Sequence, residues 1–333
     1  MGTPRLAVIG CGAIAEGYHL PALAARPELT ARAVLVDRDP GRAAAMAGRF
    51  GVPAVVSDYH DVLNEVHGAI VATPPDSHYP ICRDLIERGI SVLCEKPLVA
   101  DPEQARELVR LARERDVVLC LNHTRRFFPA SGLIRSLIQS GDLGELRSVD
   151  YVDGNAFSWP ATGFHFRRGS PGVLSDRGVH SLDLICWWLG GKPALVRSLN
   201  DSQGGPESLV WLALQHGDCR VRLKLSWLTK LPNRFRIEGE KGTVEGSVDR
   251  FDRIDLKRPS GKVETRRISC PEVQYKDFGA RVLDNFLKAM AGEAGAAVPA
   301  SGVIDSLELI DEAYRTAQRM RLPWAFEGTP SDG

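Results

Sequence analysis

The stretch that decides the fold is RLAVIGCGAIA, Arg5 to Ala15, near the amino terminus. Its apolar part predicts a buried strand over Arg5–Ile9, and GCGAIA predicts a glycine turn that leads into a helix over Ala13–Ala25. A second β-rich run, Thr30–Val36, ends at Asp37. This order of strand, glycine turn, helix, strand and acid is typical of a dinucleotide-binding unit.

The residue types of this unit each have a physical reason. Gly10 allows the tight turn, Gly12 lets the backbone approach a pyrophosphate, and Ala15 lets the helix pack close to the strand. Asp37 stands where a carboxylate accepts hydrogen bonds from ribose hydroxyls, and its charge would repel a 2′-phosphate, which favours NAD. Arg38 leaves NADP open, because a guanidinium can bind that phosphate.

The same alternation of strands and helices continues along the first half of the chain. Further helices are predicted over Pro40–Phe50, Tyr79–Arg88 and Pro102–Arg115, the last capped by Asp101, and further strands over Gly68–Ala72, Ser91–Cys94 and Val117–Leu121. Five strands separated by helices predict a doubly wound parallel sheet that ends at Asn122.

The run SVLCEKP, Ser91 to Pro97, brings chemistry to the edge of this sheet. A buried strand would deliver Glu95, Lys96 and Pro97 to its carboxyl end, where open α/β sheets bind ligands. Lys96 can be read as an ordinary strand-end charge in water or as a functional cation. The loop from Thr73 to His78 lies at a neighbouring strand end, and His78 is either an ordinary first-turn residue or a side chain facing a cofactor.

The second half of the chain has a different pattern. Strands are predicted over Leu146–Asp153, Leu195–Asn200, Ser208–His216, Cys219–Trp227, Phe235–Glu238, Thr243–Ser247, Ile254–Leu256 and Lys262–Ile268, and helices over Gln274–Ala291 and Ile304–Arg321. Turn signals between the strands predict a largely antiparallel open sheet. Because an open sheet must cover its exposed face, we expect a homodimer or homotetramer through this sheet.

A helix within Gly172–Gly191 carries the most informative polar pattern of this half. Ser175 is a plausible cap, and Val179, Leu182, Cys186 and Leu189 form a buried stripe. Asp176, His180 and Asp183 follow at intervals of four and three, so one face carries two carboxylates around a histidine, with Gly178 keeping that face open. A histidine bracketed by acids has the form of an oriented base.

A long connection, Gly154 to Pro171, precedes this helix and is rich in aromatic and cationic residues. Connections of this length are usually functional or disordered, and so many aromatics argue against disorder. We interpret it as a binding wall or lid, with a subunit contact as the alternative.

Composition sets limits on the partners and the compartment. The chain has 333 residues, enough for two domains, and its 42 basic and 42 acidic residues cancel, which argues against a nucleic-acid or membrane surface. Neither a signal peptide nor a membrane-spanning run is expected, so we expect a soluble, cytoplasmic protein. Seven cysteines lack a close Cys-x-x-C pair and are interpreted as buried, reduced thiols; no metal site is expected.

Taken together, these segments resemble the glucose-fructose oxidoreductase / inositol dehydrogenase / rhizopine-catabolism (Gfo/Idh/MocA) superfamily over nearly the full chain. The matching marks are GCGAIA at Gly10–Ala15 with Asp37, ATPPDSH at Ala72–His78, CEKP at Cys94–Pro97, the residues Asp176, Gly178, His180 and Asp183, and SGVIDSLELIDEAYRTA at Ser301–Ala317. Only the first of these marks would be common elsewhere.

The resemblance implies an α/β fold of two domains with the site between them. Residues 1–122 would be a Rossmann domain that binds NAD or NADP. Residues 123–333 would be a substrate-binding and oligomerisation α/β domain with a large open, mostly antiparallel sheet, and the C-terminal helix is a candidate to pack back near the first domain. Lys96 looks like the family's catalytic lysine, and Asp176 and His180 look like its acid–base pair.

The predicted activity is the interconversion of a secondary alcohol and a ketone on a sugar, cyclitol or nucleotide-sugar. Hydride passes to or from C4 of the nicotinamide, while histidine suits the proton transfer and a charged lysine would stabilise an alkoxide. The predicted cofactor contacts are Gly10, Gly12, Ala13, Ile14, Asp37, Arg38, Thr73, Pro74, His78, Glu95, Lys96, Pro97, Asn122 and Arg167, and the predicted substrate contacts are Lys96, His123, Arg125, Asn155, Asp176 and His180. Two alternatives stay open: a glycoside hydrolase that uses transient oxidation by NAD, and a non-catalytic dinucleotide-binding regulator.

Overall fold

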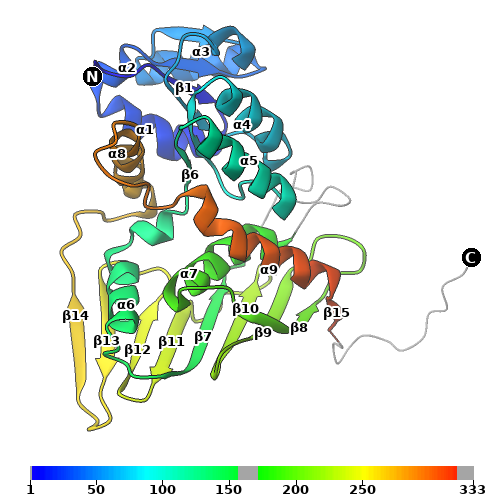
Figure 1. Ribbon diagram of the computed structural model, residues 1–333, viewed down its shortest axis with the longest axis vertical. Coiled ribbons are helices and arrows are strands. Elements are labelled where there is room, and N and C mark those ends of the chain that lie inside the picture. Colours follow the sequence, from blue (N-terminus) through cyan, green and yellow to red (C-terminus); the bar gives the residue numbers. More distant parts are fainter. Residues whose placement is uncertain (1, 157–171, 321–333) are drawn as a thin grey trace, which may run out of the picture.

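The computed structural model describes residues 2–156 and 172–320. A parallel sheet and its helices form one end of the molecule, and a second, wider sheet forms the other (Figure 1). The six parallel strands have the order β3-β2-β1-β4-β5-β6. They are β1 (Leu6–Ile9), β2 (Val34–Val36), β3 (Ala54–Val56), β4 (Gly68–Val71), β5 (Ser91–Cys94) and β6 (Leu119–Leu121).

Helices cover both faces of this sheet, so its strands are apolar on both sides. They are the π-helix Ala15–His19, α1 (Leu20–Ala24), α2 (Pro27–Thr30), α3 (Pro40–Phe50), α4 (His78–Glu87) and α5 (Pro102–Glu114), with short 3-10 turns at Tyr59–Val62 and Pro75–Ser77. One core contains residues of α4 and α5, and the other contains residues of α1 and α3. This is the doubly wound parallel sheet predicted from the sequence.

The strand boundaries correct the prediction at two places. The strand predicted from Thr30 begins only at Val34, because Pro27 to Thr30 form α2 and the Thr30 hydroxyl donates to the carbonyl oxygens of Leu23 and Arg26. A sixth strand, β3, was not predicted. It is a short edge strand of three partly exposed residues, too short to show a periodic pattern.

The second sheet has nine strands in the order β14-β13-β12-β11-β7-β10-β9-β8-β15. Its strands are β7 (Leu146–Gly154), β8 (Ala194–Asn200), β9 (Leu209–His216), β10 (Cys219–Ser226), β11 (Arg234–Gly239), β12 (Gly242–Ser247), β13 (Arg253–Lys257), β14 (Val263–Arg267) and β15 (Gln318–Arg319). Only the β7–β10 and β8–β15 pairs are parallel within the described strands, so the predicted large, mostly antiparallel sheet is confirmed.

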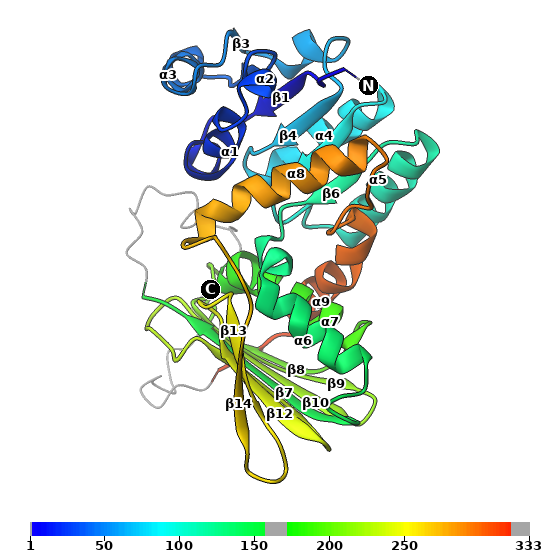
Figure 2. The ribbon, with the colours of Figure 1, turned by 90° about the vertical axis from the view of Figure 1, so that its left-hand side faces the viewer.

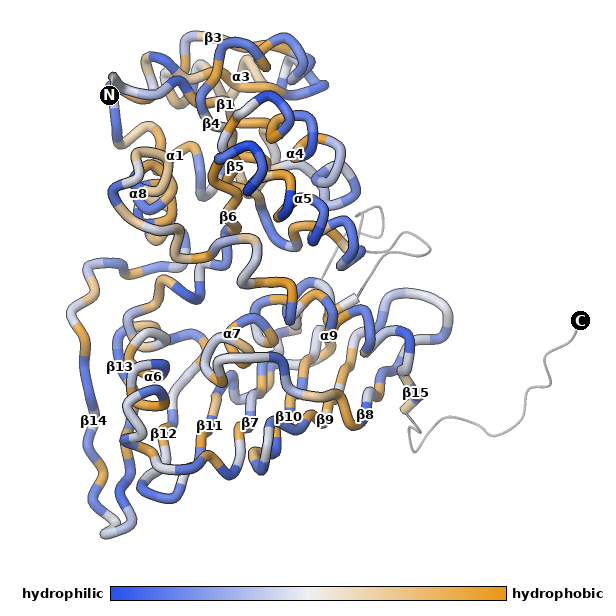
Figure 3. The backbone as a smooth tube through the Cα atoms, viewed as in Figure 1, coloured by the Kyte–Doolittle hydropathy of each residue, from blue (hydrophilic) through white to orange (hydrophobic). Residues whose placement is uncertain are grey.

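One face of this sheet, called the inner face here, packs against helices. These helices are α6 (Pro129–Gln139), α7 (Val179–Leu189) with the π-helix Leu174–Gly178 before it, and α9 (Ile304–Arg315), which follows the 3-10 turn Ala300–Val303. Figure 2 shows them between the two sheets. Hydrophobic and hydrophilic residues alternate along the strands (Figure 3), as expected when one face is buried and the other, the outer face, is not.

The chain crosses between the two ends of the molecule more than once. The 3-10 turn Thr124–Phe127 leads from β6 to α6, and the 3-10 turn Tyr275–Phe278 leads into α8 (Gly279–Met290). Val282, Leu283 and Phe286 of α8 pack in the same core as α1. The helix predicted to run to Arg321 ends at Arg315, and Gln318 and Arg319 instead pair with β8.

Six of the seven cysteines are buried and the seventh, Cys270, is half-buried; all seven are free thiols. Among the helices of residues 2–156 and 172–320, none has the length and apolar character that crossing a bilayer requires.

Candidate active site

The candidate site lies where the carboxyl end of β5 meets the π-helix Leu174–Gly178, which leads into α7. Lys96 lies two residues beyond the end of β5, and its Nζ lies 2.9 Å from Asp176 Oδ1 and 3.0 Å from the Asp176 backbone oxygen. Both side chains are partly exposed, at 22% for Lys96 and 27% for Asp176. The structure therefore brings together one residue from each half of the chain. The Lys96–Pro97 peptide is cis, and Pro97 is half-buried.

Asp176 holds the ammonium with both its carboxylate and its backbone. The indole Nε1 of Trp227 donates to the other carboxylate oxygen, Oδ2, over 3.3 Å. An ammonium has three N–H groups, and two of those of Lys96 donate to Asp176, so one remains for a further acceptor. Trp227 was not recognised in the sequence, because it lies 51 residues from Asp176 and no local pattern connects the two.

His180 lies one helical turn beyond this pair and is only 8% exposed. Its Nδ1 is buried and has no hydrogen-bond partner among the described residues. The ring of His123 meets it edge to face, with centroids 5.7 Å apart. Burial, followed by the positive charges of Lys96 and Arg125, holds the pKa of His180 well below its ordinary value. The imidazole is therefore neutral near pH 7 and available to accept a proton.

The expectation that Asp183 brackets His180 is wrong. Asp183 is buried and forms a two-pronged ion pair with Arg126, with distances of 2.8 Å to Nε and 2.6 Å to Nη2. It lies 3.5 Å from Nδ1 of His123, which is too far for a good hydrogen bond and agrees with the unsatisfied state of that nitrogen. Helical spacing could not reveal this, because Arg126, the partner of Asp183, lies 57 residues away in the sequence.

Two smaller expectations about this helix also need correction. Gly178 does not open the polar face; a Cβ there would meet side-chain atoms of Leu174 and Leu225, so the glycine allows close packing on the sheet. Ser175 is not the cap. The helical segment begins before it, and the N–H of Ser175 itself needs an acceptor, which the Tyr314 hydroxyl provides at 3.2 Å.

A cluster of charges extends the site along the second domain. Asp153 is fully buried and lies between Arg125, 2.8 Å away, and Arg177. Arg125 also donates to the hydroxyl of Tyr151 over 2.8 Å. Asn155 follows two residues after Asp153 at the end of β7 and lies close to this cluster. The predicted substrate residues Arg125 and Asn155 therefore lie in one region, although Arg125 is already paired with a carboxylate.

The glycine turn has the features that a dinucleotide needs. Gly10 has a φ of +95°, and a Cβ there would come within 2.8 Å of the Ala72 backbone, so only glycine fits. A Cβ on Gly12 would meet nothing within 4 Å, which leaves room for a ligand. Ala13 and Ile14 next to it are exposed. These residues fit a pyrophosphate above the first turn of the helix.

The Asp37 carboxylate lies beside this turn at the end of β2. It accepts the N–H groups of Cys11, at 2.8 Å, and Asp39, at 2.9 Å, and each oxygen keeps a further lone pair for a ribose hydroxyl. Arg38 is exposed. Arg42 of α3, which was not predicted, lies 3.6 Å from Asp37 Oδ2 and partly offsets its charge.

Several predicted cofactor contacts are buried, and their side chains form hydrogen bonds within the protein instead. His78 is fully buried, and its two ring nitrogens lie 2.8 Å from the Pro97 oxygen and 2.9 Å from the Thr73 oxygen, which leaves neither nitrogen for a ligand. This differs from the expectation that His78 faces the cofactor. Its imidazole instead connects the loop after β4 to the loop after β5 through these two hydrogen bonds. Thr73 itself is half-exposed and Pro74 is exposed.

Glu95 and Asn122 likewise bond inside the protein. Glu95 Oε1 accepts from His19 Nε2 at 2.7 Å and from Asn122 Nδ2 at 2.6 Å, and both Glu95 and Asn122 are buried. The Asn122 side chain also accepts from the Thr124 hydroxyl. Burial raises the pKa of the Glu95 carboxyl, but the hydrogen bonds from His19 and Asn122 outweigh it and the net pKa is lowered. This network fixes the backbone next to Lys96. Arg167, the remaining predicted contact, and most of the Gly154–Pro171 connection lie outside the described residues.

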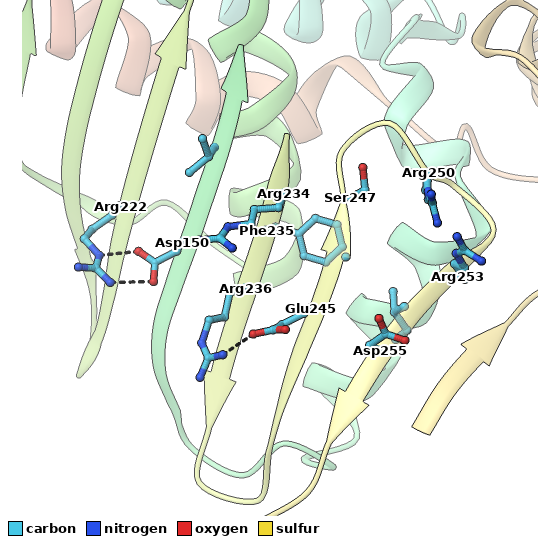
Figure 4. Close-up of a pocket in the computed structure, with 13 residues that line it drawn as sticks. Asp150, Arg222, Arg234, Phe235, Arg236, Glu245, Ser247, Arg250, Arg253 and Asp255 are labelled. Carbon is cyan, nitrogen blue, oxygen red and sulfur yellow. Dashed lines mark hydrogen bonds and ion pairs between the residues drawn. The ribbon is translucent and has the colours of Figure 1, made fainter. Parts of the chain in front are cut away.

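A cavity of about 670 Å³ lies elsewhere, on the outer face of the nine-stranded sheet. Figure 4 shows its lining, which includes Asp150, Arg222, Arg236 and Glu245. Along β7, Asp150 alternates with the buried Tyr151, so the cavity and the Lys96 site lie on opposite faces of the sheet.

Family models match both ends of the molecule. Residues 4–123 match the family model described as "Oxidoreductase family, NAD-binding Rossmann fold", and residues 133–245 match "GFO/IDH/MocA C-terminal domain". The rhizopine catabolism protein MocA of Rhizobium meliloti is 32% identical over 95% of this chain and 95% of its own. Inositol 2-dehydrogenase of Rhizobium meliloti is 24% identical over 96% of this chain and 98% of its own.

Solved structures share the same architecture. Levoglucosan dehydrogenase, in complex with NADH and levoglucosan, has a TM-score of 0.84 at 20% identity and covers 94% of this chain and 97% of its own. A 3-ketoreductase from Actinomadura kijaniata, in complex with NADP and TDP-benzene, has a TM-score of 0.83 at 22% identity and covers 97% of this chain and 100% of its own.

The chain belongs to the Gfo/Idh/MocA family of oxidoreductases, and residues 4–123 match its NAD-binding Rossmann domain. The resemblance inferred from the sequence motifs is thereby confirmed.

Proposed function

We propose that this oxidoreductase interconverts a secondary alcohol and a ketone on a sugar, a cyclitol or a nucleotide-sugar. The observation that carries the proposal is the ammonium of Lys96, held by Asp176 next to the buried and uncharged His180. A cation and a neutral base side by side suit an alcohol that must lose a proton as it is oxidised. The names of the relatives, which include an inositol 2-dehydrogenase and a levoglucosan dehydrogenase, support a polyhydroxylated substrate.

The nicotinamide ring of NAD or NADP would supply the hydride acceptor or donor. Gly10, Gly12, Ala13, Ile14 and Asp37 fit the adenosine and pyrophosphate of such a cofactor. Asp37 favours NAD, because its carboxylate would repel a 2′-phosphate. Arg38 and Arg42 beside it supply charges that could accept that phosphate. We therefore propose NAD as the preferred cofactor and NADP as a weaker one.

Lys96 stabilises negative charge on the substrate oxygen. Two of its N–H groups are fixed by Asp176, so the third has a defined direction and little freedom to lose on binding. A cation organised in this way lowers a barrier by about 3–4 kcal/mol. Asp176 orients the ammonium through its carboxylate and its backbone oxygen.

His180 accepts the hydroxyl proton during oxidation and returns it during reduction. Its low pKa keeps the ring neutral, and a neutral ring beside Lys96 avoids two adjacent positive charges. The rings of His123 and His180 pack edge to face. The role of each residue is thus set by its surroundings: one group stays charged and the other stays neutral.

The proposal is tested by the substitution Lys96→Met, assayed against a panel of sugars, cyclitols and nucleotide-sugars with NAD and NADP at equal concentration. We expect kcat to fall about 100-fold or more with the dissociation constant for the dinucleotide nearly unchanged, and kcat/KM to be higher with NAD. Lys192→Met is the matched control, since Lys192 pairs with Glu308 at the surface. Full turnover in Lys96→Met would refute the mechanism. A sugar bond cleaved without net NADH formation would point to a hydrolase instead.

We also propose that residues 1–122 bind the dinucleotide and that residues 123–333 bind the substrate.

Copies of the chain, we propose further, associate through the outer face of the nine-stranded sheet. That face carries paired charges of both signs, such as Arg222 with Asp150 and Arg236 with Glu245. It also carries apolar residues, since Trp211 lies opposite Leu199 on the neighbouring strand. Within the described part of the chain, helices cover the inner face only (Figure 2).

A further inference from the structure

The helix that carries Asp176 and His180 begins against a buried carboxylate that belongs to neither the sheet core nor the reacting groups. Glu207 lies just before β9 and is 2% exposed. Its Oε2 accepts the N–H of Gly172 over 3.2 Å, and its Oε1 accepts the N–H of Leu174 over 2.9 Å. Its own backbone oxygen accepts the N–H of Val173 over 2.9 Å.

Tyr314 of α9 completes this arrangement. Its hydroxyl donates to Glu207 Oε1 over 2.9 Å and accepts the N–H of Ser175 over 3.2 Å. The first N–H groups of a helix have no partner within the helix. Here the N–H groups from Gly172 to Ser175 all have partners, and Glu207 and Tyr314 provide every one of them.

The start of the helix packs directly on Glu207. A Cβ on Gly172 would lie 2.1 Å from the Glu207 backbone oxygen, so the two segments are in direct contact. Asp176 follows Ser175. Its N–H donates to the Gly172 oxygen over 3.2 Å, which is the first hydrogen bond within the helix. Any shift of the helix start therefore moves Asp176, and with it the partner of Lys96.

A carboxylate suits this position for electrostatic reasons. The amino end of a helix carries a partial positive charge, which stabilises an anion that receives its N–H groups. Burial raises the pKa of Glu207, while the backbone N–H groups and the Tyr314 hydroxyl act in the opposite direction. A glutamine could keep one accepting oxygen but would turn an NH₂ group toward the remaining N–H.

We infer that Glu207, with Tyr314, is a positioning residue for the proposed reaction: it fixes the start of the helix so that Asp176 holds the Lys96 ammonium in place. This inference rests on the proposed function for its kinetic consequence but not for its structural one. Neither residue touches Lys96 directly in the described structure, so the effect is transmitted through the helix.

The test compares Glu207→Gln, Glu207→Ala and Tyr314→Phe with Asp201→Asn. Asp201 is the matched control, because it lies in the same connection and accepts the N–H groups of Ser208 and Leu209, both over 2.8 Å, without contact to the helix. We expect kcat to fall about tenfold or more in Glu207→Gln, further in Glu207→Ala and less in Tyr314→Phe. The dissociation constant for NAD should stay within about twofold, and Asp201→Asn should keep its kcat.

The indole N–H signal of Trp227 provides a readout that does not require turnover. Trp227 donates to Asp176, so its NMR signal, assigned with Trp227→Phe, should move in the Glu207 and Tyr314 variants and stay in place in Asp201→Asn. An unmoved signal with unchanged kcat would overturn the inference, as would parallel losses of kcat and NAD affinity. If Lys96→Met keeps full turnover, the proposed function fails, while the Trp227 signal still decides the role of Glu207. Should Glu207→Ala not fold, Tyr314→Phe and Glu207→Gln carry the test.

Discussion

At the scale of single residues, the candidate site pairs a cationic side chain, Lys96, with a neutral one, His180. Asp176 accepts two N–H groups of the Lys96 ammonium, and burial beside that cation lowers the pKa of His180 and keeps its ring neutral. The pair resembles a general arrangement in which neighbouring groups are set to opposite roles by their surroundings. The lowered pKa of His180 has a kinetic consequence.

The consequence is a specific pH dependence for alcohol oxidation. Because the pKa of His180 lies well below its ordinary 6.5, the neutral ring persists as the pH falls through 6.5, and its function is lost only at lower pH. We expect the acid limb of kcat/KM to have its midpoint below 6.5. His180→Asn should remove this limb and reduce kcat/KM about 100-fold or more.

A pH–rate profile over the acid range checks this expectation. His60→Asn is the control, since His60 is an exposed histidine paired with Asp58. An acid limb that keeps its midpoint in His180→Asn would assign the proton transfer to another group.

The sequence predicted which residue types would reach the site but not all of their partners. The end of β5 could be predicted from an apolar run that stops at Glu95, and this placed Lys96 at the edge of the sheet. Asp183 has helical spacing from Asp176, which predicted that both acids would flank His180. Its carboxylate instead forms an ion pair with Arg126, which is far away in the sequence. Trp227 and Glu207 carry no local signal, because their contacts with the helix exist only after the sheet has folded.

At the scale of elements, most long, periodic segments were predicted, but the 11-residue helix α6 was not, and neither were the short elements. The helix α3 has the predicted bounds, with Asp39 accepting the N–H of Arg42 and Gly51 ending it at a positive φ. The short strands β3 and β15 were missed, since two or three residues cannot show a period. The π-helix before α7 was also missed, because periodicity assumes a regular helix.

The junction between elements contains a buried ion pair that we expect to be important for stability. Arg126, in the turn after β6, bonds Asp183 of α7 with two nitrogens and donates to the Gly302 oxygen over 2.7 Å. Arg126→Met would leave the Asp183 carboxylate buried without its partner. We expect the free energy of unfolding to fall by about 3–5 kcal/mol.

Denaturant unfolding of the purified variants measures this loss. The control is Arg106→Met, because Arg106 pairs with Glu103 and Glu308 at a more exposed position, where an ion pair contributes about 1 kcal/mol or less. Equal and small losses in both variants would show that the Arg126 pair contributes no more than a surface pair.

At the scale of the whole molecule, the nine-stranded sheet has one face packed on helices and one face without them in the described chain. The outer face carries the 670 Å³ cavity and the paired arginines of Figure 4. A second copy of the chain would cover both. The interface would then lie on the side of the sheet opposite Lys96, so association need not block substrate entry.

The association state can be measured by light scattering coupled to size exclusion. We expect the wild type to be a dimer or tetramer, and Trp211→Glu to shift toward the 36.4 kDa monomer, because a charge would replace an apolar contact. Val55→Glu is the control, since Val55 is exposed on β3 at the other end of the molecule. A monomeric wild type would exclude the proposed interface.

Because α8 packs back on the nucleotide-binding end, that end cannot be expressed as a simple amino-terminal fragment. A fragment that stops after β6 would lack Val282, Leu283 and Phe286, and would expose to water the apolar residues of α1 that these side chains cover. The nucleotide-binding end is therefore discontinuous in sequence. An excised version should remain monodisperse only if residues 279–290 are grafted back onto it.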